Sequence, residues 1–113
     1  MAHEEMAPPD PLAFIQRCVN QRRMFWTYHV NMRMGERAIS RNQIIEAVDS
    51  YEIIEAYPKD KYLPSYLLYA RAGSITFHVL FAADRRDDNV RVITAYRPQP
   101  SQWSNDFKTR RNP

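Results

Sequence analysis

The spacing of hydrophobic residues changes near residue 50, and this change constrains the fold more than any other feature of the sequence. Before it, apolar side chains such as Leu12, Ile15 and Val19 recur every three or four positions, as on one face of a helix. After it, as in residues 74–84, the side chains divide between two faces with a period of two, which is typical of strands. Because the helices precede the strands instead of alternating with them, we expect an α+β domain.

Helix start signals place the elements of the first half. Asp10 can cap a helix whose first position is Pro11, and Ser40 with Gln43 forms a capping box. We therefore expect helices over residues 11–23, over residues 29–37 and from residue 40 onward, with a short strand over residues 24–28. Residues 1–9 are expected to form a disordered lead before a single domain over residues 10–113.

The second half predicts four strands, over residues 51–57, 65–72, 74–84 and 90–96. Gly73 joins the second and third strands in a tight turn, and such short connections require antiparallel neighbours. The predicted fold is therefore a set of N-terminal helices packed on one face of a curved antiparallel β-sheet. After Pro100, the last residues form either a short helix capped by Ser101 or an extended basic tail.

The positive charge lies in the last quarter of the chain. The formal net charge is +3, and it divides into +4 from Arg85 onward and −1 before that residue. A basic region permits contact with a polyanion such as RNA, because neutralised phosphates supply most sequence-independent affinity. The same charge is also common in small basic proteins that bind no nucleic acid, so both interpretations remain open.

A row of three cation-capable side chains follows the first strand. His29, Arg33 and Arg37 are spaced by four residues, which on a helix gives one row about 12 Å long. Such a row could follow a nucleic-acid backbone. Its arginines could equally pair with carboxylates of the sheet and serve only packing.

These residues belong to a longer series of short motifs. The series runs through His29, Arg33-Met34, Arg37, Ile39-Ser40, Ile54, Tyr57-Pro58, Pro64-Ser65, His78-Val79, residues 92–98, Trp103 and Arg110-Arg111. In this order it resembles a family of small bacterial proteins built on a domain of unknown function, over about residues 26–111. That family is commonly grouped with the RelE/BrnT-like ribonuclease toxins. Its members are often encoded beside a YgiT-type zinc-finger protein, so the resemblance implies a RelE/BrnT toxin-like fold and a zinc-finger antitoxin as partner.

Metal-independent cleavage of RNA needs proton transfer and stabilisation of a charged phosphorane. The candidate catalytic residues are His29, His78, Arg33 and Arg37. The two histidines could form an acid–base pair only if the helix of His29 crosses the sheet beside residues 74–84. His78 could instead be a half-buried strand residue with one hydrogen bond. The candidate nucleic-acid contacts are Tyr96, Arg97, Trp103, Arg110 and Arg111.

Other classes of site find little support in the sequence. Cys18, His29 and His78 lack the spacing of metal ligands, so we expect no metal and no cofactor. A single cysteine, no visible signal peptide and no apolar run of about 20 residues favour a cytoplasmic protein without membrane contact. Two functions are expected: a toxin-like endoribonuclease that acts on RNA or the ribosome, or a catalytically inert protein-interaction module. The oligomeric state is left open.

Overall fold

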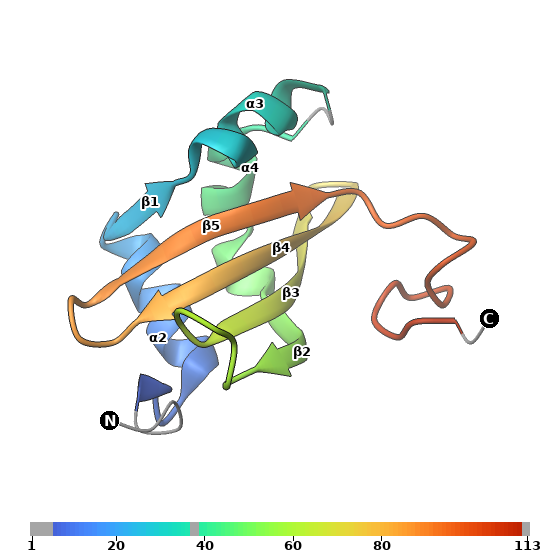
Figure 1. The fold of residues 1–113 in the computed structure, drawn as a ribbon. Helices are drawn as coiled ribbons and strands as arrows, with labels where there is room; N and C mark the ends of the chain where they lie inside the picture. Colours follow the sequence, from blue (N-terminus) through green and yellow to red (C-terminus); the bar gives the residue numbers. More distant parts are fainter. Residues whose placement is uncertain (1–5, 37–38, 112–113) are drawn as a thin grey trace.

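The computed structural model describes residues 6–36 and 39–111, and only the backbone of residues 32, 33, 35 and 36. Five strands form one sheet in the order β1-β5-β4-β3-β2, and the helices cover one face of it (Figure 1). The elements are α2 (Pro11–Asn20), β1 (Met24–Trp26), α3 (Tyr28–Glu36), α4 (Arg41–Glu46), the 3₁₀ helix η1 (Ala47–Ser50), β2 (Glu52–Tyr57), β3 (Ser65–Ala72), β4 (Ile75–Asp84) and β5 (Asn89–Tyr96). This architecture confirms the predicted α+β class.

The sheet is mixed, because a strand from outside the predicted antiparallel sheet joins it at one edge. Strands β2 to β5 are antiparallel neighbours, as expected. Strand β1, however, pairs in parallel with β5, from Met24 opposite Val90 to Trp26 opposite Val92. The long path through the helices and three strands between β1 and β5 permits parallel pairing, whereas a tight turn would not.

The first helix ends three residues before its predicted end. Arg22 has a left-handed backbone with φ of 58°, and the N–H of Arg23 donates to the carbonyl of Cys18 at 2.8 Å. A left-handed residue with such a back-bond terminates helices. That position usually carries glycine, so an arginine there did not mark the end of the helix in the sequence.

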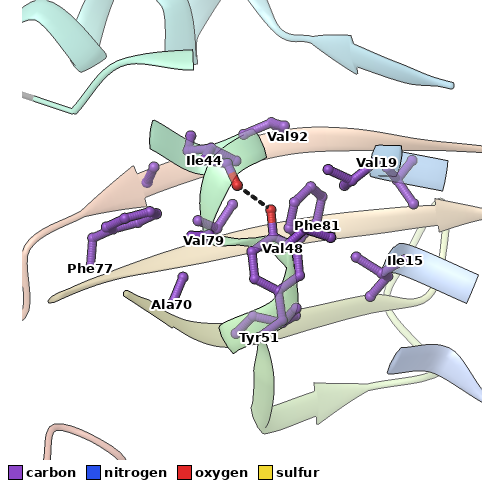
Figure 2. Packing of buried hydrophobic residues seen from close by; sticks show 14 of the residues in the cluster. Ile15, Val19, Ile44, Val48, Tyr51, Ala70, Phe77, Val79, Phe81 and Val92 are labelled. Atoms are coloured by element: carbon purple, nitrogen blue, oxygen red, sulfur yellow. Dashed lines mark hydrogen bonds between the residues drawn. The ribbon is translucent and has the colours of Figure 1, made fainter. Parts of the chain in front are cut away.

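The hydrophobic core lies between the helices and the sheet (Figure 2). Ile15 and Val19 of α2 meet Phe81 of β4, and all three side chains are fully buried. Tyr51 follows η1 and packs its ring 5.7 Å from the ring of Phe81. Its hydroxyl donates to the carbonyl of Ile44 at 2.6 Å, which ties the end of α4 to the core.

The predicted capping box at the start of α4 is confirmed. The hydroxyl of Ser40 accepts from the N–H of Gln43 at 3.0 Å, and the side-chain oxygen of Gln43 accepts from the N–H of Ser40 at 2.8 Å. Replacing Ser40 with alanine should therefore lower the free energy of unfolding by about 1 kcal/mol, as measured by urea denaturation. Ser40→Thr, which keeps the hydroxyl, should cost less; equal losses would contradict the cap.

The N-terminal residues are only partly within the described range. Residues 1–5 of the expected disordered lead lie outside it. The carbonyl of Ala7 accepts from Arg85 at 3.4 Å, and Pro8 is buried, so this part of the lead lies against the loop between β4 and β5. Among the described residues, no helix has both the length and the apolar character needed to cross a membrane.

Candidate functional site

The C-terminal segment (residues 99–111) lies on the sheet face that the helices leave open. Phe77 and Val79 belong to the helix-side core, so His78 between them points to the other face. There the ring of Trp103 packs edge-on against the imidazole of His78, with centroids 4.5 Å apart, and Trp103 is only 2% exposed. Trp103 therefore anchors the C-terminal segment to the sheet.

The conformation of the C-terminal segment matches neither sequence-based alternative. It is neither a helix from Ser101 nor an extended tail, but a run of turns closed by a β-bridge between Trp103 and Arg110. Ser104 organises these turns, because its N–H donates to the carbonyl of Thr109 and its hydroxyl donates to Asp106. Short polar side chains that bond to nearby groups in this way compete with helix formation.

Two ion pairs hold the C-terminal segment to β2. Arg110 donates to both carboxylate oxygens of Glu55, at 2.6 and 3.1 Å, and its guanidinium lies 4.6 Å from the ring centroid of Trp103. Lys108 pairs with Glu52 at 2.7 Å. Both cations therefore bind carboxylates of β2.

A cavity of about 620 Å³ opens between the C-terminal segment and the sheet. Its walls come from β2, from the strands β3 to β5 and from the chain that follows β5. The lining residues are Glu55, Tyr57, Leu67, Leu80, Thr94, Tyr96, Arg97, Pro98, Gln99, Gln102, Trp103 and Arg110. The cavity thus combines apolar strand residues with aromatic rings, amides and two arginines.

The polar groups on the β2 side of the cavity are coupled. The hydroxyl of Tyr57 donates to Glu55, and this hydrogen bond raises the pKa of Tyr57. The hydrogen bond from Arg110 holds the pKa of Glu55 below its ordinary value. Arg97 is exposed on the opposite wall, and no described residue accepts a hydrogen bond from it. Glu55 is therefore ionised and holds the side chains of Tyr57 and Arg110 in place, while the guanidinium of Arg97 faces solvent.

His78 lies fully buried behind the wall of the cavity. Its Nδ1 is 3.1 Å from the hydroxyl oxygen of Tyr96, and its Nε2 is 2.7 Å from the backbone carbonyl of Phe107. Burial lowers the pKa of His78, and the Phe107 carbonyl and the charge of Glu55 offset part of that effect. His78 therefore has two hydrogen bonds and full burial, whereas the alternative in the sequence analysis was half burial with one.

The structure brings some of the candidate residues together and leaves others apart. His78, Tyr96, Arg97, Trp103 and Arg110 come together at the cavity or directly behind its wall. His29 is exposed on α3, whose neighbours Val30 and Met34 enter the helix-side core, so the two histidines do not form an acid–base pair.

The remaining candidates lie elsewhere. The side chain of Arg33 and the whole of Arg37 lie outside the described residues, so the predicted cationic row stays a prediction. Arg111 donates to the carbonyl of Pro100 at 2.7 Å and to the side chain of Asn105 at 3.1 Å, within the C-terminal segment itself.

The candidate site residues named from the sequence do not include Glu55 or Tyr57, although Tyr57 belongs to the series of motifs. Strict alternation along β2 would place Glu52 and Glu55 on opposite faces. A bulge between Ile53 and Glu55 brings both carboxylates and Tyr57 to the face of the C-terminal segment. The positive charge of the C-terminal segment could have indicated them, because a basic segment that packs on a sheet pairs with carboxylates there.

Within the described ranges, no group of three or more His, Cys, Asp or Glu side chains is arranged to hold a metal ion.

The molecule is a small α+β domain with an open mixed sheet and a cavity that its own C-terminal segment closes on one side. The sequence model of one family, "Domain of unknown function (DUF4258)", matches residues 26–97. Because that match spans more than half of the chain, the protein belongs to this family. Neither the curated proteins nor the solved structures contain a match.

Because His78 is buried, we expect the free energy of unfolding to depend on pH. Because the pKa of His78 is lowered on folding, the unfolded chain binds more protons below the ordinary value of 6.5. The free energy of unfolding should therefore fall as the pH drops from 6.5 toward 5, before the carboxylates titrate. Urea denaturation at pH 7 and pH 5 measures this, and His78→Gln should show a flatter dependence. Equal dependence in both proteins would contradict a neutral, buried His78.

Proposed function

We propose that this protein is a toxin-like, metal-independent endoribonuclease, related to the RelE/BrnT group, and that the cavity is its RNA site. One observation carries the proposal. Tyr96, Arg97 and Arg110 are spread over the last eighteen residues of the chain, yet they line one cavity of about 620 Å³. A cavity with aromatic rings and guanidinium groups suits an unpaired nucleotide, because rings stack on bases and guanidinium forks match phosphate oxygens.

The cavity residues suit phosphate binding, stabilisation of the phosphorane and proton transfer from the 2′-hydroxyl. The 2′-oxygen attacks phosphorus, the bond to the 5′-oxygen breaks, and a 2′,3′-cyclic phosphate and a 5′-hydroxyl result. Arg97 is available to bind the phosphate and to stabilise the phosphorane, whereas the charge of Arg110 is largely offset by its ion pair with Glu55. Tyr96 supplies a hydroxyl for proton transfer, and the ring of Tyr57 is available for stacking on a base.

A second candidate is a catalytically inert protein-interaction module. It is favoured by the edge strand β1, where Phe25 is 60% exposed and the nearby Tyr28 is 80% exposed. Exposed aromatic rings at an open sheet edge are common at protein interfaces. In the toxin proposal the same edge receives the antitoxin, which the resemblance suggests is a YgiT-type zinc-finger protein.

Expression and RNA cleavage separate the two candidates. A toxin should arrest growth when produced without its partner, and the purified protein should cut single-stranded RNA in the presence of EDTA, leaving cyclic phosphate ends.

Arg97→Gln should lower the rate of RNA cleavage by at least about 10²-fold if that cation stabilises the transition state. Arg22→Gln, which removes the same charge at the end of α2, serves as the matched control. Normal growth, intact RNA and a zinc-finger complex lost in Phe25→Ser would favour the inert module.

A further inference from the structure

The hydrogen bonds of His78 determine where its proton sits. The backbone carbonyl of Phe107 can only accept, so Nε2 of His78 must donate to it across 2.7 Å. A neutral imidazole has one N–H, which leaves Nδ1 as an acceptor. The Tyr96 hydroxyl, 3.1 Å away, must therefore donate its proton to Nδ1.

This arrangement is enclosed on one side and open on the other. The rings of Trp103 and Tyr96 lie edge-on to the imidazole, at centroid distances of 4.5 and 5.3 Å, and His78 has no exposed surface. Tyr96, in contrast, lines the cavity. Tyr96 thus lies between a buried base and the space in which a ligand would lie.

The charged and titratable groups around His78 come from three sides. The carboxylate of Glu55 on β2 favours a positive imidazole, and the guanidinium of Arg110 opposes it. Tyr69 is the neighbour of His78 on β3, and the ammonium of Lys108 lies 4.9 Å from the Tyr69 ring centroid. Because the two cations pair with Glu55 and Glu52, their effect on His78 is partly neutralised.

We propose that His78 is a positioning residue that acts through Tyr96, so that the two side chains form a proton relay for the cavity. This inference rests on the proposed function. The 2′-hydroxyl gives its proton to the Tyr96 oxygen, while Tyr96 passes its own proton to Nδ1 of His78. The bond from the 2′-oxygen to phosphorus forms and the bond to the 5′-oxygen breaks. The 5′-oxygen takes a proton from water, and His78 returns its proton to the resulting hydroxide through Tyr96.

The relay explains how a tyrosine could act at neutral pH. A neutral phenol is a weak proton acceptor unless its own proton can leave at the same time. Nδ1 of His78 receives that proton without rearrangement, because the Phe107 carbonyl already fixes the ring and its tautomer. A third group that orients a base in this way recurs in enzymes with a nucleophile–base pair.

The first test is independent of any RNA. Nitrogen-15 NMR of the full-length protein at neutral pH should show Nε2 of His78 protonated and Nδ1 unprotonated. Tyr96→Phe should change the Nδ1 shift through loss of the hydroxyl hydrogen bond. Tyr69→Phe removes a hydroxyl from the neighbouring strand residue and should leave that shift unchanged. A protonated Nδ1 in the neutral ring would overturn the relay, whatever the protein does to RNA.

The second test uses the cleavage of a single-stranded RNA. His78→Gln keeps an amide donor near Phe107 and removes the acceptor for Tyr96. His78→Gln and Tyr96→Phe should each lower kcat by about 10²-fold or more with little change in KM, and the double variant should be no slower than the worse single one. Losses that multiply in the double variant would contradict the relay. An inert wild type would overturn the proposed function, and the tautomer would still be decided by NMR.

Discussion

Replacing Trp103 with alanine is expected to release the C-terminal segment from the sheet. The indole is 2% exposed, covers His78 and lies under the guanidinium of Arg110. Truncation of a buried tryptophan costs about 3–5 kcal/mol. Because the segment contacts only one face of the sheet, the loss should appear as local opening while the helix-side core stays folded.

Amide hydrogen exchange measures this opening. The N–H groups of Ser104 and Arg111 donate to carbonyls within the segment, at 2.8 and 2.9 Å, so they report its docked state. In Trp103→Ala their protection should fall by at least about 10²-fold, since each 1.4 kcal/mol is a factor of ten. Trp103→Phe keeps a ring against His78, so the protection of these N–H groups should fall much less. Unchanged protection in Trp103→Ala would show that the anchor lies elsewhere.

Replacing Phe81 with alanine should destabilise the whole domain. Phe81 is fully buried between α2 and the Tyr51 ring, at the centre of the helix-side core. The cavity left by the ring should lower the free energy of unfolding by about 3–5 kcal/mol. Urea denaturation should show a lower midpoint with an unchanged slope.

Phe25→Ala is the matched control for Phe81→Ala. The same atoms are removed from a side chain that is 60% exposed on the edge strand, so the change should stay within about 0.5 kcal/mol. A loss at Phe25 comparable to that at Phe81 would mean that the edge is buried in solution by another chain.

The elements that were predicted well from the sequence are those in which the alternation of hydrophobic residues continues over many positions. Strand β3 was predicted at the bounds found, and β4 within one residue, because their side chains pack on a core and must alternate. The helix cap at Ser40 was also predictable, since it depends on four neighbouring residues. Strand β1 has only three residues, too few to show a period, so its parallel pairing with β5 could not be read.

The candidate site was predictable in its residues but not in its geometry. Tyr96, Arg97 and Trp103 were named from motifs, yet their convergence depends on a chain reversal after β5 that has no local signal. The role of Glu55 depends on a one-residue bulge in β2, which no pattern in that strand announces. The geometry of the site therefore depends on tertiary contacts of the C-terminal segment, which the local spacing of residues does not predict.

The proposed function requires that the cavity binds the RNA backbone through Arg97. The most direct test is the dissociation constant of single-stranded RNA measured over a range of salt concentrations. Arg97→Gln should weaken binding and reduce the slope of log K against log salt by about 0.7, the value expected for one lost phosphate contact on a single strand. Arg22→Gln should keep the slope of the wild type. If Arg97→Gln keeps the wild-type slope and affinity, RNA does not meet this cavity and the proposed function is wrong.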